Sequence, residues 1–285
     1  LLCREKRRHL TKEESMSYNT IIVEKKEHIA TLTFNRPDRL NAMTGEMWDE
    51  INTAIAELDY DDEIRVLVVT GAGRAFCAGN DVRQASDREG AQSEERPATG
   101  DAGLRRLVRG PGAIVLGLQK MEKPTIASVN GVAAGNGTDI ALACDLRIGS
   151  ENTRFVNAFV RRGLVPGDGG AWFYSRVMGL GKAAEYCFTG DPIEAEEAKS
   201  AGILNYLVKA EDLEKETMAL ARKIADGPPV AIRLAKRLLY HGLGTDLETH
   251  EHLAAAYQGI AGASEDAKEG NRAFAEKRPA KYQGR

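Results

Sequence analysis

Residues 71–81 read GAGRAFCAGND and directly follow an apolar run from Val66 to Thr70. A glycine-rich turn after a strand is a common place for an anionic ligand. The dinucleotide-binding pattern G-x-G-x-x-G is excluded, because Phe76 stands where its third glycine is required. A P-loop is excluded as well, since no Gly-Lys-Ser or Gly-Lys-Thr follows at the required spacing.

A second small-residue stretch, NGVAAGNGTD at 130–139, follows the predicted strand PTIASV. It also fails the dinucleotide pattern, because Ile140 occupies the place of the last glycine. The chain therefore contains two similar strand-to-loop exits, and both offer exposed backbone amides rather than a phosphate loop.

The composition is that of an ordinary globular protein, with 42% hydrophobic and 28% charged residues over 285 positions. A net charge of −3 without a basic stripe gives no reason to expect a nucleic-acid partner. No apolar stretch approaches the ~18 residues of a transmembrane helix, so we expect no membrane span.

Four cysteines lie far apart, without C-x-x-C spacing, at Cys3, Cys77, Cys144 and Cys187. This pattern argues against a disulfide scaffold and against a metal site, and it suits the reducing cytoplasm. Residues 1–15 are basic and polar and precede Met16, so we interpret them as an upstream or non-native leader. A transit peptide is the alternative, although its acidic residues count against it.

The order of the predicted elements is that of an α/β protein with a helical C-terminal part. The pattern predicts a hairpin over 18–37, a polar mobile loop over 82–103, and helical sequence throughout after about residue 208. Between them we predict strands over 66–70, 125–129 and 145–150, and helices over 45–63, 104–121, 136–143, 170–179 and 192–202.

Five stretches, in this order and spacing, resemble the crotonase (enoyl-CoA hydratase/isomerase) superfamily from about Tyr18 to Gln283. They are NRPDRLNAM (35–43), GAGRAFCAGNDV (71–82), NGVAAGNGTDIALACDLRI (130–148), GLVPGDGGAWFYSRVMG (163–179) and AFAEKRPAKYQG (273–284). The resemblance implies an α/β fold with a crotonase-like spiral of ββα turns over 16–208. It also implies an all-helical trimerisation region over 209–285.

In enzymes of this family the two glycine-rich exits present backbone amides to the thioester carbonyl of an acyl-CoA. Matched position by position, the donors here are Asn80 and Asn136. Negative charge collects on that oxygen when an enolate-like species forms, and preorganised amides stabilise it. Asn136 is predicted to open a helix, whose N-terminus favours the same charge. The alternative is that the glycines only serve tight turns.

Hydratases of the family use two glutamates for proton transfer. Asp139 stands at the first of these positions and Phe159 at the second, and phenylalanine cannot transfer a proton. Asp168 is a substitute, because isomerase and dehalogenase members carry an aspartate one residue earlier, at the place of Gly167. The alternatives are that Asp139 only stabilises the helix dipole and that Asp168 only forms a turn.

The resemblance also assigns substrate contacts. An acyl pocket would include Phe159 and Trp172, although aromatic residues of this kind, Phe155 and Phe173 among them, more often belong to the core. The CoA part would contact Ala78, Asp81 and Arg83, and Phe274 and Lys277 would reach the CoA of an adjoining subunit, although exposed Lys and Arg side chains are usually just solvated.

These observations lead to an enzyme acting on acyl-CoA thioesters through a stabilised enolate, an enoyl-CoA hydratase/isomerase of the hydro-lyase type. We expect no cofactor apart from the CoA of the substrate, and a homotrimer or a dimer of trimers. Because Phe159 replaces a glutamate, an acyl-CoA hydrolase or a dehalogenase-like enzyme is an alternative. A relative that binds CoA without catalysis is another.

Overall fold

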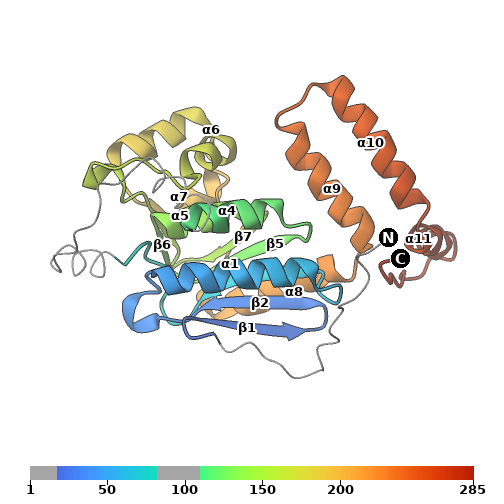
Figure 1. Ribbon diagram of the computed structural model, residues 1–285, viewed down its shortest axis with the longest axis horizontal. Helices are drawn as coiled ribbons and strands as arrows, with labels where there is room; N and C mark the ends of the chain where they lie inside the picture. The colour runs from blue at the N-terminus through green and yellow to red at the C-terminus, as the bar shows by residue number, and fades with distance from the viewer. Residues whose placement is uncertain (1–17, 82–109) are drawn as a thin grey trace, which may run out of the picture.

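The computed structural model describes residues 18–81 and 110–285 (Figure 1). The predicted leader, the predicted loop over 82–103 and Arg83 lie outside these residues. The strands form one six-stranded sheet, in the order β1-β2-β3-β5-β7-β10, and one four-stranded sheet, in the order β4-β6-β8-β9. None of the described helices is both long enough and apolar enough to span a bilayer.

The predicted hairpin is confirmed as β1 (Ile21–Lys26) and β2 (Ile29–Phe34), which pair antiparallel. Its two turn residues, Glu27 and His28, have φ values of 50° and 66°. Positive φ at both turn positions matches the right-handed twist of the two strands. The remaining strands of the large sheet run parallel to β2.

The central strands of the large sheet are buried on both faces. In β3 (Val66–Gly71), Leu67 and Val69 belong to the main core, whereas Val66 and Val68 pack on the other side with α8 (Leu213–Ala225). This two-sided burial explains why β3 is a continuous apolar run rather than an alternating one.

The main core lies between the large sheet and a layer of helices, visible in Figure 1 as α1, α4 and α5. The other elements of the sheets and helices have these bounds: α1 (Gly45–Tyr60), α4 (Pro111–Lys120), β5 (Thr125–Val129), α5 (Asn136–Ala143), β7 (Leu146–Ser150), α6 (Gly170–Thr189), α7 (Ala195–Ser200) and β10 (Tyr206–Val208). The helix predicted over 170–179 is therefore longer, and it continues past a non-helical residue at Gly179.

The small sheet was not predicted from the sequence. Its strands are β4 (Ala75–Cys77), β6 (Val132–Ala134), β8 (Arg154–Val156) and β9 (Ile193–Glu194). Strands of two or three residues are too short to show a period of two. Because β4 and β6 pair in parallel, the two glycine-rich exits that follow them lie side by side.

The last three helices extend away from the sheets, as Figure 1 shows in orange and red. They are α9 (Pro229–Gly242), α10 (Leu247–Gly262) and α11 (Glu265–Ala275), and α10 buries none of its residues. The predicted boundary after residue 208 stays a prediction, but α8 on its C-terminal side packs against the sheet. Lys236 of α9 joins this region to the core through an ion pair with Asp145.

Candidate active site

The two strand exits are in direct contact. Gly79 has a φ of 89°, and a Cβ atom there would lie 2.9 Å from the carbonyl oxygen of Ala134 and 3.8 Å from the amide nitrogen of Asn136. Only glycine meets both requirements, the left-handed backbone and the close approach. The contact forms a corner between the two loops, which we call the amide corner and define by Asn80 and Asn136.

The amide of Asn80 has a different environment from its neighbours. The amide of Ala78 donates to Leu40 and that of Asp81 donates to Met43, with N–O distances of 3.0 and 2.9 Å. Within residues 18–81 and 110–285, neither Asn80 nor Asn136 donates its amide to a backbone oxygen. Among the described residues, both amides of the amide corner therefore lack a backbone acceptor, which is compatible with an oxyanion site, although this role stays a prediction.

Close packing positions the start of α5. A Cβ atom at Gly137 would lie 2.3 Å from the carbonyl oxygen of Cys77, so a larger residue would push α5 away from β4. All eight residues of α5 are buried, Asn136 and Asp139 included. The predicted helix over 136–143 is confirmed, and it places both polar side chains inside the protein.

Asp139 has no exposed surface. Its Oδ1 accepts a hydrogen bond of 2.7 Å from the Tyr174 hydroxyl, and its Oδ2 has no partner among the described residues. Burial raises the pKa of the Asp139 carboxyl to about 8; the hydrogen bond from Tyr174 lowers it and the nearby charge of Asp168 raises it. The carboxyl is therefore mostly protonated at neutral pH.

Asp168 lies in the turn before α6 and is only 7% exposed. The side-chain amide of Asn136 donates a hydrogen bond to its Oδ2. The structure therefore brings together three residues that the sequence singled out, Asn136, Asp139 and Asp168. Their catalytic roles stay predictions.

Two groups of the candidate active site, the side chain of Asn136 and Tyr174, were not found from the sequence. There we considered only the backbone amide of Asn136, whereas in the structure the side-chain amide of Asn136 also donates a hydrogen bond to Asp168. We did not consider Tyr174 at all. The available signal was the phenol on an otherwise apolar face of the helix, because a buried tyrosine hydroxyl usually has a hydrogen-bond partner.

The predicted pocket residues have different surroundings. The ring of Phe159 is half-buried, and its Cζ lies 3.6 Å from the position of a Cβ at Gly135, next to the amide corner. Trp172 is 39% exposed, and the guanidinium carbon of Arg176 lies 3.9 Å from its ring centre. Phe155 and Phe173 belong to the core.

The predicted CoA contacts fall in two places. Ala78 and Asp81 flank the amide corner, and the Asp81 carboxylate forms an ion pair of 3.1 Å with Arg36. Phe274 is 88% exposed on α11, and Lys277 follows the same helix. In Figure 1, α11, the helix that carries Phe274, lies on the opposite side of the molecule from α5 and β6.

Comparison with known proteins agrees with this arrangement. A family model described as enoyl-CoA hydratase/isomerase matches residues 24–285. The short-chain-enoyl-CoA hydratase of Clostridium acetobutylicum is 35% identical over 92% of this chain and 97% of its own length. The 1,2-epoxyphenylacetyl-CoA isomerase of Escherichia coli is 37% identical over 90% of this chain and 95% of its own.

Solved structures share the whole fold. The crystal structure of an enoyl-CoA hydratase from Bacillus anthracis superposes with a TM-score of 0.86 at 30% identity, over 94% of this chain and all of that chain. The crotonase-like α/β fold expected from the sequence is thereby confirmed. This chain belongs to the enoyl-CoA hydratase/isomerase family, whose members act on acyl-CoA thioesters.

Proposed function

We propose that this enzyme is an enoyl-CoA isomerase, in which Asp168 moves a proton between two carbons of the acyl chain. The observation that carries the proposal is the hydrogen bond from the Asn136 side chain to Asp168. It holds a carboxylate at the residue whose backbone amide is the predicted oxyanion donor. A base and an oxyanion donor are the two groups that enolate chemistry requires.

The reaction needs no other reactant. Asp168 takes a proton from the carbon next to the thioester carbonyl, and the electron pair moves onto the carbonyl oxygen. The amides of Asn80 and Asn136 stabilise that oxygen, each by about 3 kcal/mol as for oxyanion donors in other enzymes. Asp168 then returns the proton two carbons further along the chain, and the double bond moves into conjugation with the carbonyl.

Phe159 favours isomerisation over hydration. Its ring lies against the Gly135 position, beside the amide corner, where the resemblance places a second glutamate. A phenyl ring cannot hold or activate a water molecule. The Escherichia coli relative at 37% identity is named an isomerase, which supports the same choice. Hydration is the second candidate, because the Clostridium acetobutylicum relative is named a hydratase.

In this proposal Asp139 is a neutral, protonated carboxyl close to Asp168, the residue that carries the proton. Two negative carboxylates beside the forming enolate would oppose its charge. Burial keeps Asp139 protonated, so of these two aspartates Asp168 is the one proposed to transfer the proton. The sequence named both aspartates as candidates for proton transfer, and this proposal gives that role to Asp168 and a neutral role to Asp139.

An absorbance assay separates the candidate reactions. With a 3-enoyl-CoA, isomerisation increases the absorbance of the conjugated thioester; with crotonyl-CoA, hydration decreases it, and thioester hydrolysis releases free CoA thiol. Turnover of a 4-halobenzoyl-CoA would instead indicate a dehalogenase-like enzyme. We expect isomerisation, seen as the increase in absorbance with a 3-enoyl-CoA, to be the fastest of these reactions. Asp168→Asn should abolish that increase. Loss of crotonyl-CoA as the dominant reaction, or no turnover of any substrate, would contradict the proposal.

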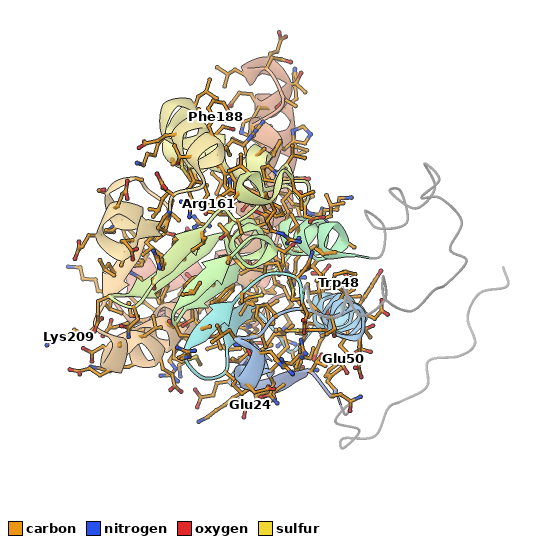
Figure 2. All side chains as sticks on the ribbon, turned by 90° about the vertical axis from the view of Figure 1, so that its left-hand side faces the viewer. Glu24, Trp48, Glu50, Arg161, Phe188 and Lys209 are labelled. Carbon is orange, nitrogen blue, oxygen red and sulfur yellow. The ribbon has the colours of Figure 1, made fainter. Side chains whose placement is uncertain are left out.

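Asp191→Asn is the matched control for the Asp168 substitution. Asp191 is also an aspartate near α6, but it is exposed and pairs with the exposed Arg161, whose position Figure 2 labels. Because this aspartate is exposed and its ion-pair partner is Arg161 rather than a residue of the amide corner, its substitution should leave the rate unchanged.

The assembly that we propose is a homotrimer or a dimer of trimers. Large apolar side chains are exposed on α9, on α10 and in the turn between them, among them Leu239, Leu243 and Leu247, and Phe188 of α6 also lies at the surface (Figure 2). Clusters of this kind are typical of interfaces between chains. Phe274 and Lys277 would then contact the CoA bound to an adjoining subunit. Light scattering should give three or six times the mass of one chain, and a monomer would contradict the proposal.

We also propose a cytoplasmic location. The three cysteines in the described part of the chain, Cys77, Cys144 and Cys187, form no disulfide. Free thiols are typical of a reducing compartment. Fractionation of the source cells, with an antibody against this protein, would test the location.

A further inference from the structure

A close crossing of α5 and α6 buries a group of polar side chains next to the amide corner. The crossing occurs at Gly170, where a Cβ atom would lie 2.3 Å from Oδ1 of Asp139 and 2.7 Å from the hydroxyl oxygen of Tyr174. Any side chain at this position would separate the two groups. The glycine therefore permits the contact between Asp139 and Tyr174.

The contact is short and is shielded from water. Tyr174 and Asp139 have no exposed surface, and the hydroxyl donates to Oδ1 over 2.7 Å. Burial raises the pKa of the Tyr174 phenol well above its ordinary value, so this hydroxyl keeps its proton and remains a donor. A neutral carboxyl that accepts at Oδ1 carries its own proton on Oδ2.

The other titratable groups that face Asp139 carry no positive charge. Asp168 lies in the turn before α6, and Tyr186 and Cys187 lie further along that helix. Among the residues that the structure describes, no lysine or arginine forms an ion pair with Asp139. Nothing in this group therefore offsets a negative charge on the carboxyl, except the hydrogen bond from Tyr174.

Tyr186 provides an internal comparison. Its ring packs edge-on against that of Tyr174, with ring centres 5.2 Å apart, and it is also buried. Within the described ranges its hydroxyl forms no hydrogen bond with Asp139, and the polar side chain that acts on its pKa through a hydrogen bond is that of Thr138. Two buried phenols thus lie side by side, and only one of them contacts the carboxyl.

We infer that Tyr174 is a positioning residue of the active site. Its hydrogen bond to Oδ1 of Asp139 confines the exchangeable proton of that carboxyl to Oδ2 and fixes the neutral carboxyl next to Asp168. The inference rests on the proposed function, in which Asp168 carries the proton. When Asp139 ionises, a second negative charge appears close to Asp168 and the enolate, and the reaction slows. Tyr174 therefore influences the alkaline limit of activity without touching the substrate.

The direction of the effect follows from the hydrogen bond. A donor to a carboxyl oxygen favours the ionised form, so its removal raises the pKa of Asp139 further. Tyr174→Phe should therefore move the alkaline limb of the pH–kcat profile upward, by about one pH unit for the loss of one hydrogen bond. A purely structural role would lower the rate without moving the limb.

The experiment compares four proteins over pH 6 to 10, the wild type, Tyr174→Phe, Tyr186→Phe and Asp139→Asn, in the isomerase assay. We expect the wild type and Tyr186→Phe to lose activity above about pH 8, the pKa of the buried Asp139 carboxyl. In Tyr174→Phe the alkaline limb of the pH–kcat profile should shift to higher pH. In Asp139→Asn this limb should disappear, because an amide does not ionise. Equal limbs in the two tyrosine variants, or an unchanged limb in Asp139→Asn, would overturn the inference.

A second readout does not depend on activity. The infrared band of a protonated carboxyl should persist at pH 7 in the wild type and be missing in Asp139→Asn. Its titration midpoint should be higher in Tyr174→Phe than in Tyr186→Phe, and equal midpoints would overturn the inference. If the wild type shows this titration but no isomerase activity, the proposed function fails and the link between Tyr174 and Asp139 remains. If Tyr174→Phe does not fold, a wild type without the band of a protonated carboxyl at pH 7 would still overturn the inference, because the inference requires Asp139 to be protonated.

Discussion

The side-chain amide of Asn136 donates a hydrogen bond to Oδ2 of Asp168. This bond joins the first residue of α5 to the turn before α6, across 32 positions of the chain. Asn136 is thus a residue with two separate functions in the proposed site. Its backbone amide is the predicted oxyanion donor, and its side chain orients the predicted proton carrier.

Asn136→Ala should separate these two functions. The backbone amide remains, so KM for the acyl-CoA should change little. A hydrogen bond to a charged acceptor contributes about 1.5–3 kcal/mol, so kcat should fall by roughly tenfold or more. Steady-state kinetics in the isomerase assay measure both constants. Asn152→Ala, at an exposed asparagine, is the control, and an unchanged kcat in Asn136→Ala would refute the orienting role.

Gly170→Ala should destabilise the protein, because the added Cβ would lie 2.3 Å from the Asp139 carboxyl. Overpacking of a buried site costs about 1–3 kcal/mol, and urea unfolding would measure it as a lower free energy of unfolding. Gly181→Ala, in the part of α6 that follows the non-helical Gly179, is the control. A Cβ there meets nothing within 4 Å, so this change should raise the free energy of unfolding by about 0.5–1 kcal/mol. Equal effects would contradict the close crossing of α5 and α6.

The burial of Asp139 predicts a dependence of stability on pH. Its pKa rises from 3.8 to about 8 in the folded protein, so between these values the folded state holds a proton that the unfolded state has lost. The stabilisation is complete below pH 3.8 and is lost as pH rises toward 8, by about 1.4 kcal/mol per pH unit for one group. In urea unfolding at several pH values, Asp139→Asn should show a flatter profile than the wild type. Parallel profiles would exclude a protonated Asp139.

The ion pair between Lys236 and Asp145 should be a main attachment of α9 to the core. Its Nζ–Oδ2 distance is 2.8 Å, and Tyr240 and Thr125 also donate to Asp145. Asp145→Ala leaves the buried Lys236 without this partner, which should lower the free energy of unfolding by about 3–5 kcal/mol.

The control for Asp145→Ala is Lys268→Ala in α11. Lys268 forms an exposed pair with Glu265, and loss of such a pair changes stability by about 0.5 kcal/mol or less. Thermal or urea unfolding would compare the two variants. If both had the same small effect, the attachment of α9 would depend on apolar contacts instead.

Local patterns in the sequence were sufficient for the family and for most elements of the fold. The hairpin, β3, β5 and α5 follow from short-range periodicity and turn residues, and the structure confirms them. The same patterns could not reveal β4 and β6, because three-residue strands carry no period. They also could not show that α8 covers one face of the sheet, since helical periodicity identifies an apolar face but not its partner.

The family, the α/β class and the candidate residues Asn80, Asn136, Asp139 and Asp168 could be read from linear motifs and their order along the chain, because each motif is a short run of neighbouring residues. The folded chain was needed to show that Asn136 contacts Asp168, that Tyr174 contacts Asp139, and that Asp139 is buried without a cation among the described residues. The contacting residues are 32 and 35 positions apart. The protonation of a carboxyl depends on burial and on neighbours, and these exist only after distant segments have packed together.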